Sequence, residues 1–219
     1  MAIKPEEIKK SNIILCEGAD CKHYVISLLN AFGAEDERFK EYQAMNFGGI
    51  NELRKYLPNF VNMEGYERVK TITIIRDAEA SAESARKSVI DSLNEIGFDV
   101  PLQAKAGDFH RAGARTVGFL ILPDIKSGSE DGTLEDLCLR TLARASDADE
   151  ILSAVNPMID RLKLKRPHKN RLHAYFSLTD EYVALKIGEA AAVHAFDFGC
   201  PEILELKCFL SRMLSAGIE

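Results

Sequence analysis

The sequence is poor in cysteine and has no long hydrophobic run. Its 219 residues include five cysteines, an odd number, and no two of them form a CxxC pair. Neither a zinc knuckle nor a disulfide framework is therefore expected. No stretch approaches the roughly 18 uninterrupted apolar residues of a membrane-spanning helix, and residues 1–10 have no apolar core. We expect a reduced, cytoplasmic protein with no signal peptide, no anchor and no membrane partner.

Motifs for nucleotide binding and for histidine–zinc sites are also missing. Neither GxxxxGK followed by Ser or Thr nor GxGxxG occurs, so no ATPase loop or dinucleotide fingerprint is present. The five histidines show none of the spacings HxH, HxxxH or HExxH. A histidine-bound zinc ion is therefore not expected.

The charge balance is acidic, and the apolar content is that of a globular protein. There are 28 Lys and Arg residues against 34 Asp and Glu, a net charge of −6, and 46% of the residues are hydrophobic. This composition excludes a disordered or fibrous chain. It argues against a general polyanion binder, but not against a local basic patch or a metal held by carboxylates.

Short apolar runs alternate with helical patterns over the first 133 residues. Helix-type spacing follows the first run, and β-branched residues dominate the third, VKTITII. Strands separated by helices predict an α/β fold with a mainly parallel sheet and helices on both faces. The expected strands are residues 12–16, 42–47, 69–75 and 117–122, with an edge strand or loop at 103–115. The expected helices are residues 20–32, a helix opened by Gly48 and Gly49 that carries Ile50, Leu53 and Leu57, and 84–96.

Beyond residue 133 only helices are expected. We interpret residues 1–145 as an α/β core and residues 146–219 as a helical extension packed on that core. The expected helices of this half are residues 134–142, 148–162, 169–178, 182–193 and 201–214.

Acidic residues follow the apolar runs at their carboxyl ends. In an open parallel sheet these ends share one edge, where ligands bind. Converging carboxylates repel one another unless a cation neutralises them, and hard oxygen ligands suit Mg²⁺ or Mn²⁺. Helix capping is the alternative explanation for Asp20, Asp77, Glu135 and Asp136. The acids are Glu17, Asp20, Asp77, Glu79, Asp124, Glu135 and Asp136.

At these residues the sequence resembles the Toprim fold of topoisomerases, bacterial primases, recombination-repair proteins and OLD-family nucleases. Residues 13–20 (IILCEGAD) match the family's strand ending in Glu-Gly, and residues 74–79 (IIRDAE) match its strand ending in Asp-x-Asp. More closely, the chain resembles small, uncharacterised stand-alone Toprim-like bacterial proteins. That group also has a Leu-Pro-Asp strand end, here at residues 122–124, and a Gly-x-Leu-Glu-Asp-Leu helix start, here at residues 132–137.

The resemblance implies a divalent-metal site with Mg²⁺ or Mn²⁺. Glu17, Asp77 and Glu79 would be catalytic residues and ligands, and Glu17 could instead act as general base or acid. The candidates for a second metal are Asp20, Asp124, Glu135 and Asp136. Glu79 departs from the family pattern, which usually has Asp there, so activity follows from the resemblance less directly than the fold does.

A basic segment covers residues 161–173 (RLKLKRPHKNRLH), with six Lys or Arg residues and no acid. Beside a carboxylate site it fits a groove for a phosphate backbone; a solvated helix face is the alternative. The expected nucleic-acid contacts are Lys169 and Arg171, then Lys165 and Arg166.

Three functional hypotheses remain open at this point. The favoured one is metal-dependent phosphodiester chemistry on DNA or RNA, in a Toprim-like or OLD-like nuclease. The second is a catalytically degenerate Toprim-like module that binds nucleic acid or a protein. The third is a small-molecule phosphohydrolase on a similar sheet.

Overall fold

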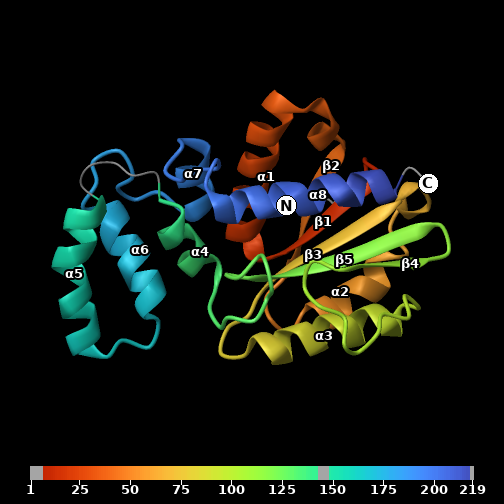
Figure 1. Cartoon of the computed structure of the whole chain (residues 1–219), viewed down its shortest axis with the longest axis horizontal. Helices are drawn as coiled ribbons and strands as arrows, with labels where there is room; N and C mark the ends of the chain where they lie inside the picture. The colour runs from red at the N-terminus through yellow and green to blue at the C-terminus, as the bar shows by residue number, and fades with distance from the viewer. Residues whose placement is uncertain (1–6, 143–147, 218–219) are drawn as a thin grey trace, which may run out of the picture.

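The protein is an α/β structure built on a five-stranded sheet, as the sequence pattern predicts (Figure 1). A computed structural model describes residues 7–142 and 148–217. The sheet order is β2-β1-β3-β5-β4, and β4 alone runs antiparallel to its neighbour β5. The strands are β1 (Asn12–Glu17), β2 (Tyr42–Gly48), β3 (Thr71–Asp77), β4 (Phe109–Ala112) and β5 (Arg115–Leu122).

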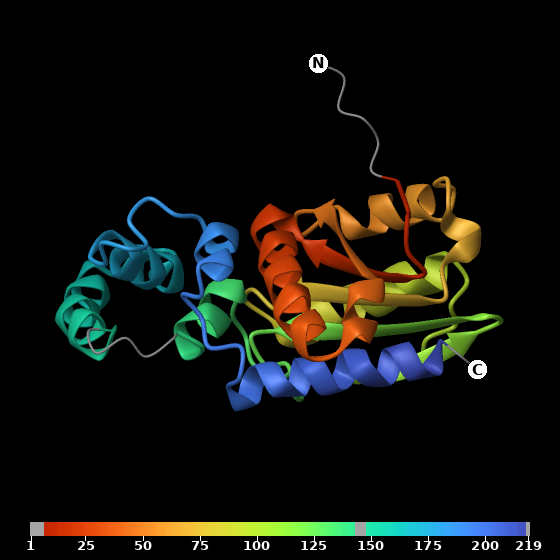
Figure 2. The same cartoon turned by 90° about the horizontal axis from the view of Figure 1, so that it is seen from above.

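Helices cover both faces of the sheet because the central strands are apolar on both sides. One face carries α1 (Gly18–Glu35) and α8 (Pro201–Ala216), and the other carries α2 (Leu53–Phe60) and α3 (Ala82–Glu95) (Figure 2). Alternate residues of β3 divide between the two layers: Ile75 packs toward α1 and α8, whereas Ile72 and Ile74 pack toward α2 and α3. Short 3₁₀ helices, Glu37–Glu41 and Tyr66–Arg68, join the larger elements.

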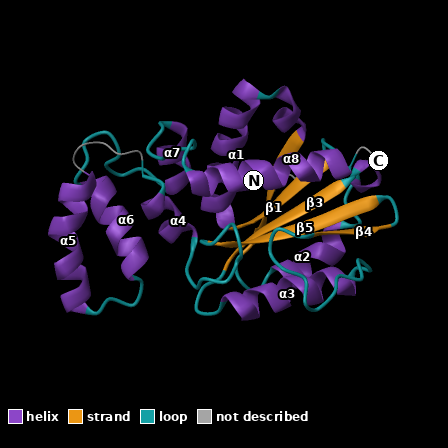
Figure 3. Cartoon of the chain, in the orientation of Figure 1, coloured by secondary structure: helices purple, strands orange, loops and turns teal. Residues whose placement is uncertain are grey.

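The remaining helices lie beyond the carboxyl end of the strands (Figure 3). They are α4 (Leu134–Arg140), α5 (Ala148–Leu162), α6 (Pro167–Ser177) and α7 (Ile187–Ala192). α5 and α6 form a hairpin, α6 also packs on α4, and α7 packs on α1. The chain then returns as α8 along the length of the sheet.

Two predicted helices begin later than their sequence pattern indicates. Gly48 takes a left-handed φ of 101°, and a turn precedes α2, so Ile50 is 41% exposed instead of lying on a helix. In the second case Ala184 has a φ of 66°, which interrupts the expected helix 182–193 and delays α7 until Ile187. Both differences arise where local backbone geometry overrides apolar spacing.

The proposed boundary between residues 145 and 146 lies outside the described residues, as do residues 1–6 of the polar start. α8 supplies Phe209, Leu210 and Met213 to the hydrophobic layer that covers β1, β3 and β5. The extension therefore completes the packing of the sheet. Within the described ranges, none of the helices has the length and apolar character needed to cross a bilayer.

Candidate acidic centre at the carboxyl edge

Glu17 ends β1 and Gly18 begins α1 directly, without a loop. Gly18 takes a φ of 79°, a conformation that glycine adopts without steric cost. The pairing register of β1 with β2 also shifts between Cys16 and Glu17. The turn therefore holds the Glu17 side chain at the edge of the sheet, with only 9% of it exposed.

Arg76 is the buried counter-charge of Glu17. Its Nε lies 3.6 Å from Glu17 Oε2, and its side chain is 6% exposed. Its Nη1 donates to Ser88 Oγ at 2.7 Å and its Nη2 to the Ile50 carbonyl at 3.1 Å, which fixes the guanidinium. Among the described residues, Glu17 Oε2 and Arg76 Nε each have no hydrogen-bond partner. Burial raises the pKa of Glu17 even though Arg76 opposes that rise.

Asp77 ends β3 and lies beside the start of α4. Its Oδ1 accepts a hydrogen bond from the Leu134 backbone N–H at 2.9 Å. Burial raises the pKa of Asp77 to about 8, and the negative charges of Glu17 and Glu135 add to that rise. The hydrogen bond from the Leu134 N–H opposes this rise but does not outweigh it.

Glu135 is a buried acid with its own cation. Lys169 Nζ of α6 lies 2.9 Å from Glu135 Oε1, and the Glu135 side chain is 8% exposed. Burial alone would raise the pKa of Glu135, but hydrogen bonds from Lys169 and Thr133 outweigh burial and lower it. A salt bridge thus joins the α5–α6 hairpin to the acidic edge.

Glu79 lies in the turn after β3, with an exposed side chain. Its backbone has a left-handed φ of 56° and exchanges two hydrogen bonds with Gly132, at 2.7 and 2.9 Å. These bonds tie the turn after β3 to the loop before α4. The negative charge of Glu79 contributes to the raised pKa values of both Glu17 and Asp77.

The other predicted metal ligands have separate positions or partners. Asp20 is exposed in the first turn of α1. Asp136 Oδ2 accepts hydrogen bonds from the N–H of Thr133 at 2.9 Å and from its Oγ1 at 3.3 Å, so it caps α4. Helix capping, the alternative explanation, therefore accounts for Asp136. Asp77 also accepts a hydrogen bond from the first turn of α4, but it does so from the end of β3.

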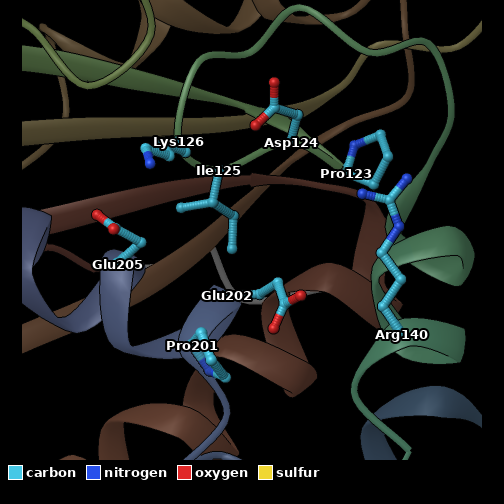
Figure 4. A pocket seen from close by; sticks show the side chains of 8 residues that line it. All are labelled: Pro123, Asp124, Ile125, Lys126, Arg140, Pro201, Glu202 and Glu205. Carbon is cyan, nitrogen blue, oxygen red and sulfur yellow. The ribbon is translucent and has the colours of Figure 1, made fainter.

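Asp124 lies in a loop that satisfies its carboxylate locally. Burial would raise its pKa, but hydrogen bonds from Ser127 and Ser129 lower it to about 2. It lines a cavity of about 230 Å³, with Arg140 of α4 and Glu202 and Glu205 of α8 across from it (Figure 4). This cavity mixes both signs of charge and includes none of Glu17, Asp77 or Glu135.

Part of the basic segment is held in intramolecular contacts. Lys169 contacts Glu135, as described above, and Arg171 Nη2 lies 2.5 Å from Asp160 Oδ1 of α5 while its Nε donates to Asn156. Lys165 and Arg166 are exposed in the turn between α5 and α6.

Arg76 and the Leu134 N–H are the site groups that sequence reasoning missed. A signal for Arg76 was present, because a charged residue follows directly on the β-branched residues of β3. Nothing in the sequence indicates the Leu134 N–H, because its partner Asp77 lies 57 residues away.

The donor chemistry fits a hard divalent cation held by two carboxylates. Mg²⁺ commonly binds one or two carboxylates and keeps several waters, and Glu17 Oε2 has no hydrogen-bond partner within the described chain. Over the same residues, no three or more His, Cys, Asp and Glu side chains group closely enough to share one ion. The site therefore suits an ion that takes two ligands from the protein and the others from water, and not an ion enclosed by protein ligands.

The fold and this edge define an α/β protein with an acidic centre at the carboxyl end of a mostly parallel sheet. The chain belongs to the family described as "Protein of unknown function (DUF3226)", whose profile matches residues 11–215. Comparison with curated proteins and with solved structures gave no match.

Proposed function

We propose that this protein is a Toprim-like enzyme that performs divalent-metal-dependent chemistry on nucleic-acid phosphodiesters at the Glu17–Asp77 centre. The observation that carries the proposal is the meeting of buried acids at the carboxyl edge. Glu17 Oε2 is buried without a hydrogen-bond partner among the described residues, and Asp77 is close enough to Glu17 and Glu135 for their charges to raise its pKa. A cation at this position would offset the repulsion and allow the carboxylate to ionise at neutral pH.

The residues of the chain have distinct roles in this proposal. Glu17 and Asp77 hold Mg²⁺ or Mn²⁺, and Glu79, exposed in the turn after β3, adds negative charge at the same edge. Such an ion, when bound, polarises phosphoryl oxygens and lowers the pKa of a coordinated water. Arg76 fixes the orientation of Glu17, and the Leu134 N–H fixes that of Asp77. Glu17 alternatively takes a proton as general base.

The phosphate backbone, of DNA or RNA, would contact the exposed Lys165 and Arg166 first. Both are exposed at the turn of the α5–α6 hairpin, which is tied to the acidic edge through Lys169. Lys169 and Arg171 would contact phosphate only by exchanging their present carboxylate partners, Glu135 and Asp160, for it.

A cleavage assay tests the enzyme proposal. Supercoiled plasmid, single-stranded DNA and single-stranded RNA are incubated with Mg²⁺ or Mn²⁺, and we expect cleavage that EDTA abolishes. Glu17→Gln and Asp77→Asn should each lose at least about a hundredfold in rate, whereas Asp36→Asn, at a partly exposed acid paired with Arg38, should retain activity. Equal cleavage by all of these chains would contradict the proposal.

A second candidate, the degenerate binding module, is favoured by one observation. Arg76 and Lys169 already pair with Glu17 and Glu135, so resident cations neutralise part of the acidic edge. Calorimetric titration with Mn²⁺ separates the two candidates. No heat of binding at millimolar Mn²⁺, together with nucleic-acid binding that EDTA leaves unchanged, would favour the module.

A further inference from the structure

α5 carries an exposed apolar stripe on the outermost helix of the molecule. It lies farther from the sheet than the other helices in two perpendicular views (Figures 1 and 2). Ala148 and Ile159 are buried, and Ile151 and Leu152 pack against the core while partly buried. Met158 and Leu162, in contrast, are each 56% exposed. Residues at spacings of three and four share one helix face, which defines the α5 stripe as the exposed Ala154, Met158 and Leu162 together with the partly buried Ile151.

The two ends of α5 carry opposite charges on the same flank of this stripe. Glu150 lies in the first turn and Arg161 in the last, both exposed. Eleven residues apart, they are three helical turns from each other and therefore face the same side. Within the described part of the chain, neither of them forms a salt bridge.

The α5 stripe and its flanking charges match those of a second α5 that runs antiparallel to the first. In such a pair, residues about equally far before and after Asn156 face each other across a two-fold axis. Ala154 then lies opposite Met158 of the second copy, a small residue against a large one, and Ile151 lies opposite Leu162. The same arrangement brings Glu150 against Arg161 twice, as a two-fold contact requires.

We propose that the α5 stripe is a homodimer interface, occupied by α5 of a second copy of this chain in antiparallel orientation. A contact made by one pair of helices is at the small end of stable interfaces, so the dissociation constant is of micromolar order. The inference does not depend on metal binding or catalysis.

Sedimentation equilibrium of the full chain tests the apolar part of the interface. We expect a wild-type dimer and, for Met158→Glu, a dissociation constant raised about a hundredfold. Ser153→Glu introduces the same charge at an exposed position away from the stripe and should leave the dimer intact. Far-ultraviolet circular dichroism checks that each variant is folded.

Charge reversal tests the orientation of the two helices. Glu150→Arg and Arg161→Glu should each weaken the dimer about tenfold, because each places like charges opposite one another twice. An equimolar mixture of the two variants should form heterodimers of wild-type strength, since every opposed pair is then complementary. A wild-type chain that is monomeric up to about 100 µM overturns the proposal. A dimer that survives Met158→Glu, or a mixture no stronger than its components, also overturns it.

Discussion

Asp77 and Arg76 are neighbours in β3 with opposite electrostatic roles. Asp77 is a buried acid among other acids, so its pKa rises to about 8. Arg76 is a buried base whose guanidinium is held by Ser88 and by the Ile50 carbonyl, facing Glu17. Neighbouring negative charges therefore destabilise the ionised form of Asp77, whereas Arg76 partly offsets this effect at Glu17.

Asp77→Asn should flatten the pH dependence of stability. In the unfolded chain the aspartate ionises near 3.8, whereas the folded protein keeps the proton until about pH 8. Between these values the folded state binds more protons, so the free energy of unfolding falls as pH rises, by at most about 1.4 kcal/mol per pH unit. Urea unfolding in EDTA from about pH 5 to pH 9 measures this slope. An equal slope for wild type and Asp77→Asn would refute the raised pKa of Asp77.

Arg76→Met should destabilise the protein by about 3–5 kcal/mol near neutral pH, because it leaves the buried Glu17 carboxylate without its counter-charge. Arg38→Met is the control: Arg38 pairs with Asp36 at the surface, and its loss should cost at most about 1 kcal/mol. Denaturant unfolding of both variants provides the comparison. Similar losses for the two would show that Arg76 is not a buried ion-pair partner.

At the scale of elements, the start of α4 organises the acidic edge. Its first turn supplies the Leu134 N–H to Asp77 and the Glu135 carboxylate to Lys169. The loop before it pairs with the turn after β3 through Gly132 and Glu79. A single short helix thus connects β3, α6 and the acids of the centre.

Asp136→Ala should lower the free energy of unfolding by about 1 kcal/mol, the usual effect of losing a helix cap, and should leave Mn²⁺ binding at Glu17 and Asp77 unchanged. The comparison is Glu130→Ala, which removes an acid in the loop before α4 whose salt bridge to Arg140 is exposed; its change should be within about 0.5 kcal/mol. Thermal unfolding and calorimetric Mn²⁺ titration give the two readouts. Loss of Mn²⁺ affinity without loss of stability would make Asp136 a ligand instead of a cap.

At the scale of the whole molecule, the last helix is part of the core. α8 lies along the sheet, and Gly118 of β5 leaves room for it: a Cβ there would approach Phe209 Cζ to 2.9 Å. The Tyr42 hydroxyl of β2 donates to the Leu210 carbonyl at 2.7 Å, across 168 residues of sequence. The extension thus stabilises the strands that position the acids.

Phe209→Ala should cost about 3–5 kcal/mol, because Phe209 is 2% exposed and packs over the sheet. Leu204→Ala, on the same helix but 44% exposed, should cost less than about 1 kcal/mol. Urea unfolding of the two variants tests whether α8 stabilises the core. Equal small losses would mean that α8 is an appendage.

The sequence by itself determined the fold class, the limits of α5 and the strands at whose ends the acids stand, because apolar period and β-branched content act locally. The predicted starts of α2 and α7 were wrong, because local turn geometry at Gly48 and Ala184 overrides apolar spacing. Only the tertiary structure decided which acids meet. Asp77 and Glu135 lie 58 positions apart, and β3 and α4 bring them together, while Asp124 and Asp136 acquire local partners instead. The counter-charges Arg76 and Lys169 were decided in the same way, since burial and pairing depend on neighbours that are distant in the chain.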